Sequence, residues 1–175
     1  MTEDMRASLK HYEDLQSGLR IRLGTTRVTK EMIIGFATEF DPFPFHLDEA
    51  AAKKSLLGGL AASGWQTAGL CLRLLVDAFL SKVDSRGGLG FSNLKWKRPV
   101  MVGDEITGTV TLSDLRRSES HPEWAIMTLE FDIRNQRNEP VMTMSLANTA
   151  AVGISRAAIA AAPRIPACRI FSFSL

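Results

Sequence analysis

The stretch FATEFDPFPFHLDEAAAKKSLLGGLAASGW, residues 36–65, determines how the rest of this chain is interpreted. It sets an acid and an imidazole, Asp41 and His46, five positions apart with two prolines between them. Proline fixes its own φ and disfavours helix at the residue before it, so a helix entering this stretch must end near Phe40. We therefore expect Asp41 to Phe45 to form a rigid, non-helical connector that carries two reactive side chains.

The segment before the connector predicts a short strand and a helix. Residues 1–24 are charged and are expected to form a partly helical lead-in, followed by a short strand over residues 25–28. Thr29 has the hydroxyl of an N-cap, and apolar residues then recur at helical spacing up to Phe40. After the connector, residues 46–54 predict a second short helix, in which the early Asp48 is a surface charge favoured by the helix dipole.

The dominant helix is expected over residues 58–82. Its first turns consist of glycine, alanine and serine, which allow close approach by another backbone, and its later turns are rich in leucine. Apolar residues occur nearly all round it, so most of its circumference should be covered.

After Gly87-Gly88 the apolar period changes to two, which indicates strands. Four are expected: residues 89–96, a strand marked by Ile106, Val110 and Leu112, one over 127–133, and one beginning at 142–146 after a turn at 135–140. Short turns make neighbouring strands antiparallel. An antiparallel sheet wrapped around a long central helix is a single hot-dog fold of the α+β class.

Composition fits one globular domain, with residues 153–175 as an Ala- and Pro-punctuated tail after a domain at 1–152. The net charge of +2 and the scattered basic residues argue against nucleic acid or a membrane as partner. Cys71 and Cys168 are expected to be free thiols, and no secretory signal is visible. The expected compartment is therefore the cytoplasm.

The segment Asp41-Pro42-Phe43-Pro44-Phe45-His46, with the small-residue stretch at 58–65, resembles the signature of the MaoC-like dehydratases, the R-specific enoyl-CoA hydratase family. The resemblance extends over most of residues 20–152, through Trp96, Arg98-Pro99-Val100, Gly103-Asp104 and the turn at 135–137. It implies R-specific hydration of a trans-2-enoyl-CoA or the reverse dehydration. CoA would be the substrate's carrier with no other cofactor, and the protein would be a homodimer.

The residues support that chemistry. A carboxyl group and a neutral imidazole, here Asp41 and His46, can share one water, taking a proton from it and delivering one to the substrate. Negative charge then develops on the thioester oxygen, and a backbone N–H at a helix start can stabilise it. The resemblance assigns that N–H to Gly59. Thr67 is a candidate second donor, and Phe43, Phe45, Trp65 and Gln66 are candidate walls of the pocket.

Phe43 stands where the family usually has Asn or Gln. It should make the mouth of the pocket drier and narrower, which favours an unsubstituted apolar acyl chain. The same fold and pocket would also suit a thioesterase, and Phe43 suits a non-catalytic acyl-thioester-binding subunit.

The sequence does not contain a complete version of the other common catalytic motifs. Ala61 breaks a nucleophile elbow around Ser63, no phosphate-binding glycine loop is complete, and no His or Cys pair has metal-ligand spacing.

Overall fold

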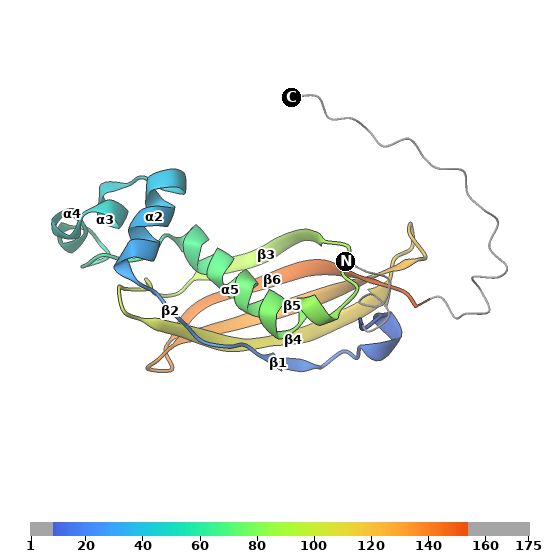
Figure 1. Cartoon of the computed structure of the whole chain (residues 1–175). Helices are drawn as coiled ribbons and strands as arrows, with labels where there is room; N and C mark the ends of the chain where they lie inside the picture. Colours follow the sequence, from blue (N-terminus) through green and yellow to red (C-terminus); the bar gives the residue numbers. More distant parts are fainter. Residues whose placement is uncertain (1–8, 154–175) are drawn as a thin grey trace, which may run out of the picture.

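The sheet is antiparallel throughout and curls around one helix (Figure 1). The computed structural model describes residues 9–153, so the tail from residue 154, with Cys168, lies outside the described residues. Strand order is β1-β4-β5-β6-β3, and β2 also pairs with β4. The strands are β1 (Arg20–Arg22), β2 (Thr26–Arg27), β3 (Gly88–Trp96), β4 (Glu105–Arg117), β5 (Trp124–Asn135) and β6 (Pro140–Ala151).

The register of the strands aligns apolar side chains on the face that meets the helix. Ile21 lies opposite Val110, which lies opposite Phe131, which lies opposite Met144, and all four are buried. Along β5 the side chains alternate between buried and more exposed, which is the period-two pattern expected of a sheet with one buried face. The row of four therefore ties β1, β4, β5 and β6 to one core.

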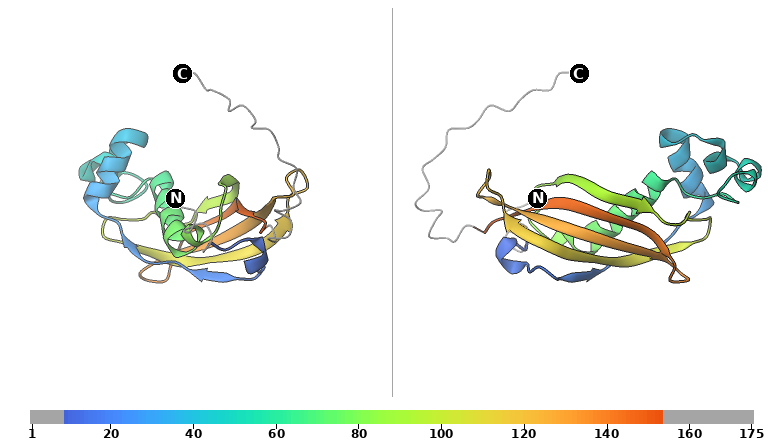
Figure 2. Two further views of the ribbon diagram at one scale, coloured as in Figure 1. Left: turned by 45° about the vertical axis from the view of Figure 1, so that its right-hand side comes forward. Right: turned by 180° about the vertical axis from the view of Figure 1, so that it is seen from behind.

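Helix α5 (Gly64–Ala78) lies along the concave face of this sheet, and Figure 2 shows the sheet from behind with α5 on its far side. Cys71 and Leu75 are fully buried beneath it, and Leu74 is nearly so. A short 3-10 turn, η2 (Leu80–Lys82), follows the helix. The predicted hot-dog fold of the α+β class is confirmed.

Helices α2 (Lys30–Phe40), α3 (Pro44–Leu47) and α4 (Glu49–Lys54) gather beside the N-terminal end of α5 (Figure 1). Thr29 caps α2 as expected, because its hydroxyl oxygen accepts a hydrogen bond from the Met32 amide at 3.3 Å. Lys30 and Glu49 join α2 to α4 with an ion pair of 2.6 Å. None of the described helices is long and apolar enough to cross a lipid bilayer.

The described part of the lead-in is partly helical as expected, through the 3-10 turn η1 (Tyr12–Asp14), but it also contains strand β1, which was not predicted because three residues are too few to show a period. Two predicted helices have other bounds in the structure. The helix expected over 46–54 is two helices. They meet at Asp48, which is not merely a surface charge, since its carboxylate caps α4 by accepting from the Ala51 amide at 2.7 Å.

The largest error concerns the start of the long helix, which is Gly64 and not Gly58. Residues 60–62 are extended because their backbone groups bond to another segment. The Ala62 amide donates to the Val100 carbonyl at 2.8 Å, and the Val102 amide donates to the Leu60 carbonyl at 3.1 Å. Ser63 then caps the helix, so the glycine-rich stretch is a loop that leads to the helix start.

Candidate active site

Asp41 and His46 are brought together by the end of one helix and the start of the next. Asp41 is the C-cap of α2, with φ −152° and ψ 64°, and Pro44 opens α3 at its first turn. The intervening connector is even shorter than predicted, because α3 already begins at Pro44. His46 is buried, with 7% of its surface exposed.

One hydrogen bond assigns the tautomer of His46. Its Nδ1 lies 2.8 Å from the carbonyl oxygen of Ala61. A carbonyl oxygen only accepts, so Nδ1 carries the proton and donates it, and Nε2 of the neutral ring keeps its lone pair. That lone pair makes Nε2 a base.

Nε2 of His46 faces the carboxylate of Asp41 across a distance of 3.6 Å to Oδ2. This is longer than a direct hydrogen bond, and a water beside the pair can reach both atoms. The Asp41 side chain is 20% exposed, so water can reach the gap. The two side chains can therefore contact one water molecule together.

The pair opens into a cavity of about 430 Å³ with mainly apolar walls. Of the residues predicted for the site, the cavity is lined by Asp41, Phe45, His46, Trp65 and Thr67. Residues that were not predicted for the site complete the lining: Leu57, Ala62, Ser63, Gly64, Trp96, Lys97, Arg98, Pro99 and Val100.

Gly64, the first residue of α5, presents its backbone to this cavity. The Trp65 amide donates a hydrogen bond to the Ser63 hydroxyl oxygen at 3.2 Å. The Gly64 amide, in contrast, has no hydrogen-bond partner among the described residues. Trp96 donates its Nε1–H to the Gly64 carbonyl at 3.0 Å, and a Cβ at position 64 would lie 2.5 Å from the indole ring. Only glycine fits under Trp96 here, and its N–H is an open donor at a helix N-terminus.

Gly59 does not occupy the position expected of it. It lies in the loop before the helix and lines a separate hollow with Gly58 and Met101, not the cavity of Asp41 and His46. The premise that Gly59 lies at the helix N-terminus is wrong. The sequence signal for the true start was Ser63, a preferred N-cap residue directly before a glycine and a long apolar run.

Three other candidates have contacts that change their expected roles. Thr67 lines the cavity, but its hydroxyl donates to the Ser63 carbonyl at 3.2 Å and so is already engaged. Gln66 is not a wall residue, because it faces α2 and donates to the Met32 carbonyl at 2.7 Å. Phe43 does not line the cavity either. This residue is 57% exposed, and its ring stacks on Phe45 with centroids 5.2 Å apart.

The structure thus defines a hot-dog protein in which an acid–imidazole pair, Asp41 and His46, and the open backbone donor of Gly64 line one apolar cavity. Residues 18–128 match the MaoC like domain family, and the chain belongs to that family. Among the described residues, no group of three or more His, Cys, Asp or Glu side chains is placed to hold a metal ion.

Solved structures and curated proteins agree with this assignment. The chain is similar to the MaoC-like dehydratase from Rhodospirillum rubrum, at 40% identity over 83% of this chain and 99% of that one, with a TM-score of 0.75. It is also similar to the (R)-hydratase of A. caviae, at 30% identity over 81% and 99%, with a TM-score of 0.63. An (R)-specific enoyl-CoA hydratase of Rhodospirillum rubrum is 27% identical over 61% of this chain and 72% of that protein.

Proposed function

We propose that this protein is an (R)-specific hydratase of trans-2-enoyl thioesters such as enoyl-CoA, and that it also catalyses the reverse dehydration. The observation that carries the proposal is the 3.6 Å distance between His46 Nε2 and Asp41 Oδ2. Both residues line the same apolar cavity. The hydratase relatives support the same reaction class.

In the proposed reaction, a water beside the pair contacts both the carboxylate of Asp41 and Nε2 of His46. The water oxygen bonds to C3 of the enoyl group while Nε2 takes one of its protons. The C2=C3 electrons move toward C1, which places negative charge on the thioester oxygen. His46 then returns the proton to C2, so the hydroxyl and the hydrogen add across the double bond and both protein groups are regenerated.

The Gly64 amide is the donor that we assign to the thioester oxygen. It stands at the N-terminus of a fifteen-residue helix, so the helix dipole adds to the effect of the hydrogen bond. Loss of one such donor typically costs about 3 kcal/mol of transition-state stabilisation.

The position of the pair also bears on stereochemistry. Asp41 and His46 approach the substrate from one side, so hydroxyl and hydrogen are expected to add to the same face of the double bond. The (R) assignment for the product follows the named specificity of the relative from Rhodospirillum rubrum. The reaction involves no net oxidation, so we propose that CoA serves as the substrate's carrier and that no further cofactor takes part.

A panel of trans-2-enoyl-CoAs of different chain lengths tests the proposal. Hydration removes the conjugated-enoyl absorbance without releasing thiol, and chiral analysis of the product gives its configuration. Release of free CoA thiol would instead identify a thioesterase. A wild-type protein that binds the thioesters but does neither would be a binding subunit, and the hydratase proposal would fail.

We also propose that the protein is a homodimer with two-fold symmetry. β3 is an edge strand, and its outer side and one flank of α5 carry apolar side chains that are 37–57% exposed: Trp65, Leu72, Val76, Leu89, Phe91 and Trp96. Light scattering at micromolar concentration should give a dimer. Phe91→Asp should weaken it, whereas Leu56→Asp, at an exposed position elsewhere, should not. An active wild-type monomer would refute this proposal.

A further inference from the structure

We propose that Arg98, assisted by Lys97, binds a phosphate of the carrier to which the acyl group is attached. The ligand chemistry is the phosphate of a phosphopantetheine thioester, present in CoA and in acyl-carrier proteins. This inference rests on the proposed function, since it assigns the part of the substrate that lies outside the reacting centre.

The two cations have a fixed place beside the cavity. They follow β3 directly, and both line the same cavity as Asp41 and His46. Their amides donate to the Val141 carbonyl at 2.7 and 3.3 Å, which fastens their backbone to β6. Among residues 9–153, they are the only lysine and arginine that line this cavity, so they define its positive side there.

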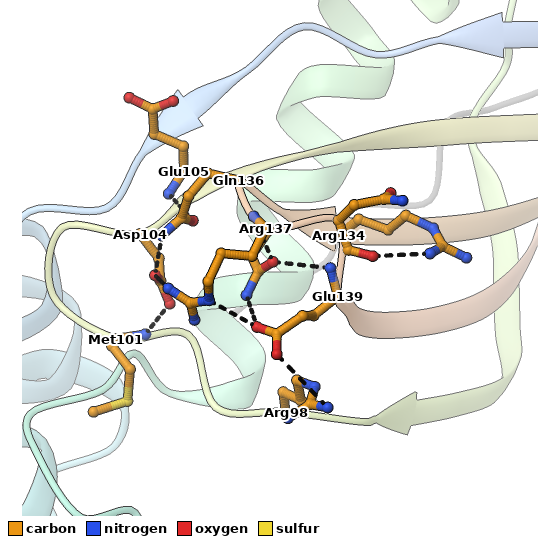
Figure 3. Close-up of polar contacts among 10 residues, drawn as sticks. Arg98, Met101, Asp104, Glu105, Arg134, Gln136, Arg137 and Glu139 are labelled. Atoms are coloured by element: carbon orange, nitrogen blue, oxygen red, sulfur yellow. Dashed lines mark hydrogen bonds and ion pairs between the residues drawn. The ribbon is translucent and has the colours of Figure 1, made fainter.

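The guanidinium of Arg98 faces Glu139 but keeps its N–H groups available as hydrogen-bond donors. Its Nη2 lies 3.8 Å from Oε1 of Glu139, an ion pair that is too long for a hydrogen bond (Figure 3). No side-chain hydrogen bond of Arg98 is found among residues 9–153, and its side chain is 53% exposed. A planar guanidinium with free N–H groups is well suited to bidentate binding of phosphate.

Glu139 can orient Arg98 because it is itself held firmly. Its Oε2 accepts a hydrogen bond from Arg137 Nε at 2.9 Å (Figure 3) and another from Asn135 Nδ2 at 2.8 Å. These bonds lower the pKa of Glu139 from its ordinary value, Asn135 having the larger effect, so it stays ionised at neutral pH. The other oxygen, Oε1, is left to face Arg98.

The charge distribution in the cavity gives the substrate a direction. Asp41 repels phosphate from the reacting end, and the apolar walls suit the acyl chain, whereas Lys97 and Arg98 attract the anionic end of the carrier. Lys97 has no ion-pair partner within the described part of the chain. Both cations are solvent-exposed, so the attraction should weaken as salt is added.

The test compares trans-2-enoyl thioesters of pantetheine and of 4′-phosphopantetheine, which differ by one phosphate. In wild type, we expect kcat/KM to favour the phosphorylated form by on the order of 10-fold, mainly through KM. Arg98→Gln should bring the ratio to within about 2-fold, and Lys97→Gln should lower it less. Enoyl-CoA and an enoyl-carrier protein, as further arms, show whether the contact serves one carrier or both.

Arg116→Gln is the matched control, because Arg116 is 56% exposed and pairs with Asp114 at 3.9 Å, away from the cavity. It should keep the wild-type ratio. The proposal would be overturned if Arg98→Gln leaves the ratio of kcat/KM between the two thioesters unchanged, whether both values stay at the wild-type level or both fall equally.

Calorimetric titration with CoA separates this proposal from the proposed function, since it needs no turnover. Arg98→Gln should raise the Kd about 10-fold relative to wild type and Arg116→Gln. If no thioester is hydrated but this difference persists, the hydratase proposal fails and the phosphate contact stands. Equal affinity of all three proteins for CoA would refute the contact.

Discussion

Replacing Gly64 by alanine should damage both the fold and the reaction. The added Cβ would lie 2.5 Å from Cε2, 2.8 Å from Nε1 and 2.9 Å from Cδ2 of Trp96, which is closer than real Cβ contacts allow. The ring must move, and its 3.0 Å hydrogen bond to the Gly64 carbonyl is then lost. Overpacking costs about 1–3 kcal/mol and the lost bond about 1 kcal/mol, so we expect a loss of stability of roughly 2–4 kcal/mol.

The same substitution should slow the reaction, because the Gly64 amide is the proposed donor to the thioester oxygen. Complete loss of such a donor lowers kcat by about 10²–10³-fold. Alanine keeps the N–H but displaces it, so a decrease in kcat/KM of at least about 10-fold is expected. Urea unfolding gives the stability term, and initial rates on an enoyl-CoA give the catalytic one.

Two other glycines serve as controls. A Cβ at Gly69, in the same helix, meets nothing within 4 Å, so Gly69→Ala should stabilise the protein by about 0.5–1 kcal/mol. A Cβ at Gly59 would meet the terminal methyl of Met101 at 2.8 Å, and this flexible side chain can move away. Full activity in Gly64→Ala together with a large loss in Gly59→Ala would refute the assignment of the donor to Gly64.

Asp41→Asn and His46→Ala should each lower kcat by about 10²-fold or more while the protein stays folded, and wild-type kcat in both would remove them as the catalytic pair. Phe43→Gln should change the ratio of kcat/KM between a straight-chain and a hydroxylated enoyl-CoA by no more than about 10-fold, since its ring lies outside the cavity. Burial raises the pKa of the Cys71 thiol from 9.0 to about 12. In a Cys168→Ser variant, Cys71 should therefore resist thiol reagents until unfolding, and stability should fall as pH rises above 9.0 because only the unfolded thiol ionises there.

The sequence predicted most where local pattern and local chemistry coincide. Alternating apolar residues revealed β5, and the Thr29 hydroxyl gave the start of α2, because each signal spans only a few neighbouring positions. The pairing of Asp41 with His46 was predictable for the same reason, since Pro42 and Pro44 leave the connector little freedom. The tautomer of His46 was not, because its partner, the Ala61 carbonyl, belongs to another segment.

The helix start was misplaced because small residues carry little directional information. The stretch from Gly58 to Ser63 suits a close-packed helix as well as an extended loop, and only its partners decide between them. Its backbone groups bond to Val100 and Val102, which lie far along the chain. The cavity walls supplied by residues 96–100 were missed as site residues for the same reason.

The segment that decides this helix start is itself fixed by a distant turn. Asp104 is buried, its Oδ2 accepts from the Met101 amide at 2.9 Å, and its Oδ1 accepts from Gln136 Nε2 at 2.7 Å. The turn after β5 therefore holds residues 98–104, and these residues hold the loop that ends at Ser63. We therefore expect the Gly103-Asp104 and Asn135-Gln136 signatures to affect the proposed reaction at a distance, since their hydrogen bonds hold the loop that leads to Gly64.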